Sequence, residues 1–104
     1  MPEAAPEHDS TRDNFSVFVG TLPGRTVVRV VGELDIATLP ALVEVLRSTP
    51  GPVTIDASQL TFLDACSIGV LARADQTKGV SVRHVNPACR LVFEVCGLEG
   101  MLID

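Results

Sequence analysis

The sequence has few basic residues and no basic cluster. Eight Lys and Arg residues stand against 13 Asp and Glu residues, so the 104-residue chain has a formal net charge of −5. A nucleic-acid-binding surface needs positive charge to neutralise phosphates, and this composition argues against one. No apolar run is long enough to cross a membrane, and no signal peptide opens the chain. We therefore predict a cytoplasmic protein that binds neither nucleic acid nor a membrane.

Cysteine and histidine are also scarce. Cys66, Cys89 and Cys96 are odd in number, and their spacings match neither a disulfide scaffold nor a zinc site. Reduced thiols are the default for such a chain in the cytoplasm. His8 and His84 are the only residues that could add imidazole ligands. We predict no metal site and no cofactor.

Catalytic signatures are missing as well. The chain has no glycine-rich phosphate loop, no nucleophile elbow, and no Ser/His/Asp or Cys/His set with a credible second member. Asp56 and Asp64 could be read as paired carboxylates, but Asp56 at the expected end of a strand has a simpler structural role. We predict that the protein is not an enzyme.

What the chain does contain is the pattern of one α/β domain. Residues 1–13 are polar and Pro-containing and predict a disordered tail, while residues 14–104 form a domain with a single core. Apolar periodicity and turn residues predict strands at Phe15–Thr21, Thr26–Leu34, Val53–Asp56, Val80–Val85 and Met101–Ile103. Helices are expected at Leu39–Ser48, at Ala65–Thr77, and from Pro87 to just before Gly97. This β-β-α-β-α-β-α-β order predicts a mixed sheet of four to five strands with helices packed against it.

Local signals set the helix ends. With Thr38 as the N-cap, Pro40 lies in the first turn, where its missing N–H costs nothing. Asp64 is the expected N-cap of the second helix, and Asn86 that of the third. Ser58 reads as a plain turn residue after the third strand.

The segment Phe62–Leu71, with sequence FLDACSIGVL, joins a predicted strand to a predicted helix. It resembles the loop of the STAS domain, and specifically of the anti-sigma factor antagonists (anti-anti-sigma factors), which reads roughly F-[ILM]-D-S-S-G-L-G-[VL]-[LI]. The run Gly32–Asp35, GELD, resembles a second landmark of that family. The resemblance covers about Phe15–Asp104 and implies the STAS fold.

The resemblance also implies a function. Such antagonists bind an anti-sigma factor, an ATP-binding kinase of the histidine-kinase type, and so release a sigma factor that directs transcription. The implied partner-binding surface is centred on the second loop and flanked by the first, and it comprises Asp35, Thr38, Asp64, Ala65, Cys66, Ser67 and Gly69. A purely structural reading of these residues, as caps and polar turns, remains open. So does a STAS subunit of a lipid or anion transport system, or of a sensory scaffold complex.

The position of the family's phosphorylated serine holds Ala65, which has no hydroxyl. We therefore expect an antagonist that serine phosphorylation does not switch off; the alternative is that binding has been lost and only the fold persists. Ser67 stands where the family has glycine, and about 200° of helical rotation separates it from residue 65. It is expected to face the loop or to donate a local hydrogen bond, and phosphorylation there stays open.

Cys66 leaves two readings open. A thiol in the first turn of a helix can be unusually reactive, and a redox switch could replace the absent phosphorylation switch. Cys89, in the first turn of the third helix, is the easier partner for a bridge to Cys66. The alternative is that Cys66 is a small, buried core residue.

Overall fold

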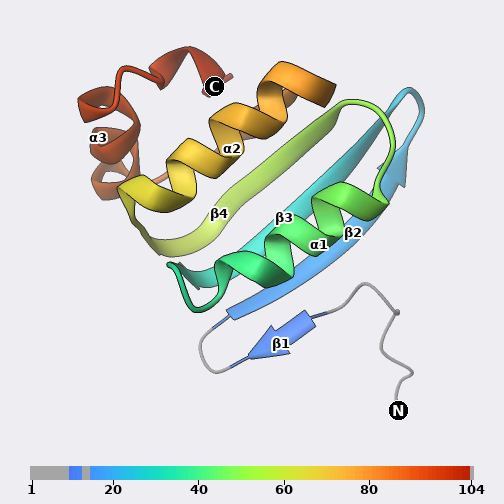
Figure 1. Ribbon diagram of the computed structural model, residues 1–104, viewed down its shortest axis with the longest axis horizontal. Coiled ribbons are helices and arrows are strands. Elements are labelled where there is room, and N and C mark those ends of the chain that lie inside the picture. The colour runs from blue at the N-terminus through green and yellow to red at the C-terminus, as the bar shows by residue number, and fades with distance from the viewer. Residues whose placement is uncertain (1–9, 13–14, 104) are drawn as a thin grey trace.

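The computed structural model describes residues 10–12 and 15–103 and contains one mixed sheet. Its five strands are hydrogen-bonded in the order β1-β2-β3-β4-β5 (Figure 1). The first three pair antiparallel, and β3, β4 and β5 pair parallel. Their bounds are β1 Ser10–Arg12, β2 Phe15–Leu22, β3 Arg25–Leu34, β4 Val53–Leu63 and β5 Val80–Arg83. The predicted α/β class and mixed sheet are confirmed.

The helices are α1 Leu39–Ser48, α2 Ala65–Lys78 and α3 Pro87–Val95. Figure 1 shows α1 and α2 lying across the same face of the sheet, with α3 beside the N-terminal half of α2. Alternate residues of the strands point toward these helices and are buried, as Val28 and Val30 of β3 are. Leu42 of α1 and Ile68 of α2 are fully buried against them. The core therefore lies between the sheet and the helices.

Strand β4 is much longer than the predicted Val53–Asp56. It runs to Leu63, because two irregularities let it stay paired with β3. Between the pairs Arg29–Asp56 and Val31–Gln59, β4 holds one residue more than β3. Ser58 lies in this bulge rather than in a turn, and its N–H donates to Asp56 Oδ1 at 3.0 Å. The prediction of a turn at Ser58 is wrong.

The second irregularity follows at once. Gly32 pairs with Leu60, but Glu33 pairs with Phe62, so β4 again holds an extra residue. The bulges change the burial pattern, since across them the buried side chains of β4 recur every third residue, at Ala57, Leu60 and Leu63. A strand is recognised by a period of two, and this is why sequence reasoning ended β4 too early.

Two ends of the chain also differ from expectation. Ser10–Arg12, which were placed in the disordered tail, form β1 against β2. An unpaired sheet edge offers backbone donors and acceptors to any short segment beside it. The rest of the predicted tail, residues 1–9 and 13, lies outside the described residues.

At the other end, Glu99–Met101 form a 3₁₀ helix in place of the expected strand Met101–Ile103. The chain reaches β5 only at Leu102, which forms a single parallel bridge with Val82. Strand β5 itself stops at Arg83, short of the predicted Val85, because His84 has a left-handed backbone (φ 65°) that turns the chain away from the sheet.

The predicted helix signals of α3 are confirmed. The Asn86 side chain accepts a hydrogen bond from Cys89 N at 2.8 Å, as an N-cap does. Gly97 has φ 72°, and Leu98 N donates to Phe93 O at 2.8 Å, the pattern of a Schellman ending. Within the described ranges, no helix is both long and apolar enough to span a bilayer.

Candidate functional site

The loops that follow β3 and β4 meet at one edge of the sheet. Parallel neighbouring strands end on the same side, and here Leu34 pairs with Leu63 at that edge. Asp64 N donates to Leu34 O at 3.3 Å, which ties the start of α2 to the end of β3. We call the segments Asp35–Thr38 and Phe62–Gly69 together the two-loop site. The predicted proximity of the two family landmarks is thus confirmed.

Asp35 and Thr38 hold the first loop through a closed set of hydrogen bonds. Asp35 Oδ1 accepts from Ala37 N at 3.0 Å and from Thr38 N at 3.1 Å. Thr38 Oγ1 donates to Glu33 O at 2.8 Å and accepts from Asp35 N at 3.0 Å. Thr38 is the N-cap of α1, as predicted, but its buried side chain makes no capping bond. The Asp35 carboxylate bonds N–H groups of the loop before α1, and Leu39 N, the first of the helix, donates to Asp35 O at 2.8 Å.

Asp64 and Ser67 hold the second loop. Asp64 caps α2, since its Oδ1 accepts from Ser67 N at 2.8 Å. Ser67 is fully buried, and its hydroxyl lies 3.4 Å from Leu34 O, across in β3. Its hydrogen bond is therefore a long-range contact between the loops rather than a local one. A kinase could reach this hydroxyl only after the loop had opened.

Ala65, Cys66 and Gly69 are the members of the predicted surface that face solvent. Ala65 lies at the exposed first position of α2, where its side chain offers only a methyl group. Asp35 and Asp64 are half-buried, while Thr38 and Ser67 are buried. Of the seven predicted residues, three are thus exposed to solvent and four hold the loops in position.

Two apolar side chains that sequence reasoning did not single out are also presented here. Ile36 is 74% exposed, and Phe62 is 48% exposed. Ile36 is an apolar residue between two turn-forming polar ones, which was an available signal. The exposure of Phe62 could not be read from the pattern, because it depends on the second bulge of β4.

The cysteines separate by burial. Cys66 is exposed, which rules out its reading as a buried core residue. Cys89 is buried among the core side chains, and this burial raises the pKa of its thiol, with partial opposition from the hydrogen bond to Asn86. All three thiols are free. Because the Cys89 thiol is buried and its pKa is raised, it is poorly suited to the redox role that the sequence left open.

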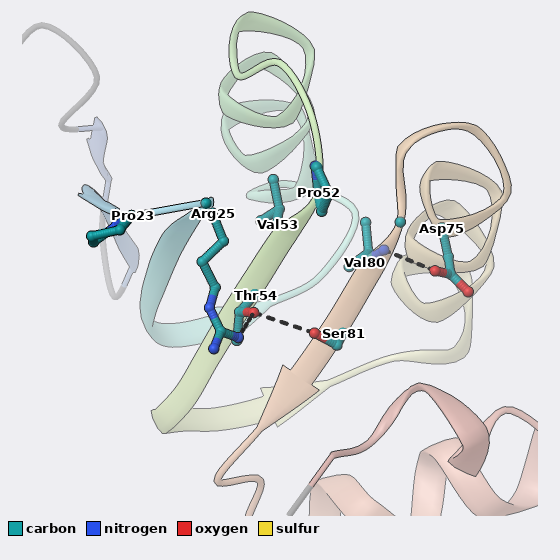
Figure 2. A pocket seen from close by; sticks show the side chains of 10 residues that line it. Pro23, Arg25, Pro52, Val53, Thr54, Asp75, Val80 and Ser81 are labelled. Atoms are coloured by element: carbon teal, nitrogen blue, oxygen red, sulfur yellow. Dashed lines mark hydrogen bonds between the residues drawn. The ribbon is translucent and has the colours of Figure 1, made fainter.

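A pocket of about 550 Å³ lies at the opposite end of the parallel strands (Figure 2). Arg25 Nη1 donates to Thr54 Oγ1 at 3.1 Å, and the Thr54 and Ser81 hydroxyls are 3.3 Å apart. Its one carboxylate, Asp75, accepts from Val80 N at 2.8 Å. This lining offers no nucleophile with a base beside it. Among residues 10–12 and 15–103, no cluster of His, Cys, Asp and Glu could hold a metal ion.

Comparison with protein families gives one matching model, described as "Mlab, STAS domain", which covers residues 17–104. Among curated proteins, the chain is 32% identical over 78 residues to the anti-sigma-F factor antagonist RsfB of Mycobacterium tuberculosis. That alignment covers 71% of this chain and 64% of RsfB. The chain thus spans somewhat less than two thirds of this relative.

Solved structures share the fold. An anti-sigma factor antagonist from Mycobacterium paratuberculosis superposes with a TM-score of 0.76 at 28% identity, covering 89% of this chain and 86% of that one. The unphosphorylated form of the anti-sigma factor antagonist SpoIIAA gives a TM-score of 0.70 at 18% identity, with 85% and 86% covered. The second likeness concerns the fold alone.

Proposed function

The chain belongs to the STAS domain family, and from this premise we propose that it is an anti-sigma factor antagonist. It binds an anti-sigma factor in the cytoplasm and so releases a sigma factor, which regulates transcription indirectly. The similarity to RsfB and to the mycobacterial antagonist structure supports this role. The observation that carries the proposal is the two-loop site, where both family landmarks are held side by side.

The geometry of this site suits binding rather than catalysis. Its polar side chains are engaged in hydrogen bonds that fix the loops, as with Asp35 on Ala37 N and Asp64 on Ser67 N. A surface fixed in advance loses little conformational entropy when a partner docks. The role proposed for the protein is capture of another protein, with no reaction of its own.

The proposed partner is an ATP-binding anti-sigma factor of the histidine-kinase type. In a regulated antagonist, a phosphoryl group at the position of Ala65 adds about −1.5 to −2 charges at the N-terminus of a helix. The helix dipole tolerates that charge, but a partner surface packed against it does not. Ala65 cannot accept the group, so this chain stays competent to bind at all times.

The test is binding to each purified anti-sigma factor encoded in the genome that encodes this chain. Wild-type protein should bind one of them, with or without ATP, and should remain unmodified by mass spectrometry. The Ala65→Ser variant should bind the same partner, gain one phosphoryl group when ATP is added, and then dissociate. Ala37→Ser is the matched control, since it places a serine on an exposed position of the first loop; it should bind and stay unmodified.

The outcomes separate the parts of the proposal. Failure of folded wild-type protein to bind any of these anti-sigma factors contradicts the antagonist role. Binding without modification of Ala65→Ser contradicts only the kinase nature of the partner. Phosphorylation of the wild-type chain, followed by release, contradicts permanent competence.

The description of the matching family model, "Mlab, STAS domain", names no sigma factor and is equally compatible with a second candidate. This is a STAS subunit of a lipid or anion transport system, or of a sensory scaffold complex. Isolation of the tagged chain from its native cells, followed by identification of stoichiometric partners, distinguishes the candidates. Transport or scaffold subunits in place of an anti-sigma factor would favour the second.

A further inference from the structure

We infer that the two-loop site engages its partner through an apolar contact anchored by Ile36 and Phe62, so the anti-sigma factor presents an apolar patch to it. This inference rests on the proposed function and specifies the chemistry of that same site. It differs from the surface that the family resemblance implies, which includes neither Ile36 nor Phe62.

The acidic side chains of the site already accept hydrogen bonds from backbone N–H groups of this chain. Asp35 Oδ1 accepts from two backbone N–H groups of its own loop, at 3.0 and 3.1 Å. Asp64 Oδ1 accepts from Ser67 N at 2.8 Å. Both residues are half-buried. A partner that drew either carboxylate away would break a cap and loosen the surface that it binds.

The side chains that the two-loop site exposes to solvent are apolar or carry a thiol. The exposed residues of the two-loop site carry only aliphatic, phenyl or thiol groups, or no side chain: Ile36, Ala37, Phe62, Ala65, Cys66 and Gly69. Ala65 is one of these exposed residues, and its methyl group adds no charge to them. The largest apolar areas are those of Ile36 and Phe62.

Both anchors, Ile36 and Phe62, are held in place by the backbone around them. Ile36 lies inside the turn that the Asp35 carboxylate closes, since the N–H groups of the two residues after it bond to that carboxylate. Phe62 is fixed by the second bulge of β4, which sets it opposite Glu33, while the next residue, Leu63, points into the core. Large side chains that are ordered before binding make efficient anchors.

Single exposed apolar residues are common on proteins. Leu22, 52% exposed, is an example at the hairpin between β2 and β3, the far end of the sheet from the two-loop site. Ile36 and Phe62 differ because they belong to the two segments of the two-loop site, Ile36 after β3 and Phe62 at the end of β4. Leu22 therefore serves as a matched control.

The test uses the anti-sigma factor that binds wild-type protein in the panel above, with Ile36→Ser, Phe62→Ser and Leu22→Ser variants. Each anchor variant should raise the dissociation constant by about tenfold or more, and Leu22→Ser should raise it by less than about twofold. Because Ile36 is mostly exposed, its variant should keep the wild-type melting temperature, which separates loss of contact from loss of fold. The dissociation constant of the wild-type complex should change by less than about threefold between low and high salt, because an apolar contact is not screened by ions.

Three results would overturn the inference. One is wild-type affinity in both anchor variants; another is a loss of more than about tenfold in wild-type affinity at high salt, which indicates a charge-driven contact. The third is that the anchor variants abolish self-association of this chain without affecting the anti-sigma factor. Absence of binding by wild-type protein would instead count against the proposed function, so the two failures are distinguishable.

Discussion

At the scale of single residues, the two-loop site shows how a polar side chain can be essential without being presented. Thr38 and Ser67 are buried, and each sends its hydroxyl to a backbone carbonyl of the β3 end: Thr38 to Glu33 O, and Ser67 to Leu34 O. These bonds connect the start of a helix to the end of a strand. Their role is to position Ile36 and Ala65, which solvent and a partner can reach.

Thr38→Val tests this positioning role. The variant keeps the shape of the side chain but leaves Glu33 O and Asp35 N without the hydroxyl between them. We expect the free energy of unfolding to fall by about 1–3 kcal/mol, because buried polar groups lose their partner. Denaturant unfolding measures the change. Thr61→Val is the control: this hydroxyl also bonds a backbone carbonyl, Gly32 O at 3.1 Å, but it is exposed. An equal loss in both variants would argue against a special role for Thr38.

At the scale of elements, the ends of α1 and α2 are joined at the far side of the molecule. The Lys78 ammonium group, in the last turn of α2, donates to Leu46 O at 2.6 Å and also to Thr49 O. These carbonyls belong to the C-terminal end of α1, where the helix dipole favours a cation. One side chain thus caps a helix to which it does not belong.

Lys78→Met should lower the free energy of unfolding by about 1 kcal/mol, since the end of α1 loses its cap. Arg47→Met is the matched control, because Arg47 also lies in the last turn of α1 but is exposed and is 3.9 Å from Glu44. Little change is expected there. Equal effects in the two variants would show that general charge, rather than the Lys78 contact, matters.

Wild type and Lys78→Met should also differ in how their free energies of unfolding depend on pH. Burial lowers the pKa of Lys78 from the ordinary value of 10.5. Between the folded and unfolded pKa values the unfolded chain binds more protons, so stability rises with pH in that window. The difference in unfolding free energy between wild type and Lys78→Met should therefore widen as the pH approaches 10.5. A difference that narrows would contradict the lowered pKa of the half-buried Lys78 ammonium group.

At the scale of the whole molecule, the sheet separates two regions. The two-loop site lies where β3 and β4 end, and the pocket at Arg25, Thr54 and Ser81 lies where β3, β4 and β5 begin (Figure 2). The core between them is packed by side chains of the sheet and of the helices above it (Figure 1). No residue that lines the pocket belongs to the two-loop site.

Arg25→Ala should therefore leave partner affinity within about twofold of wild type, because mutations at distant, unshared positions act independently. Isothermal titration with the same anti-sigma factor measures this. Ile36→Ser, just beyond the other end of β3, is the comparison variant, and its affinity for the anti-sigma factor should be reduced. A loss of affinity in Arg25→Ala as large as that of Ile36→Ser would mean that the interface extends to the pocket or that the two ends are coupled.

Much of the fold followed from local patterns. The N-caps Asp64 and Asn86 and the glycine that ends α3, Gly97, act over a few neighbouring residues, so their effect is visible without tertiary contacts. The substitution at residue 65 is of the same kind, since a missing hydroxyl is missing in any conformation. The sequence by itself therefore determined the helix boundaries and the absence of a hydroxyl at residue 65, where the proposed function places the phosphate acceptor.

The tertiary structure decided which side chains are presented. The length of β4 and the exposure of Phe62 depend on extra residues that pair irregularly with β3, a strand distant in sequence. Ser67 is buried beside the end of β3, where Leu34 O lies within reach of its hydroxyl, and Ile36 is exposed in the loop that the Asp35 carboxylate turns. Exposure is a property of neighbours brought together by pairing and packing, and no local pattern encodes it.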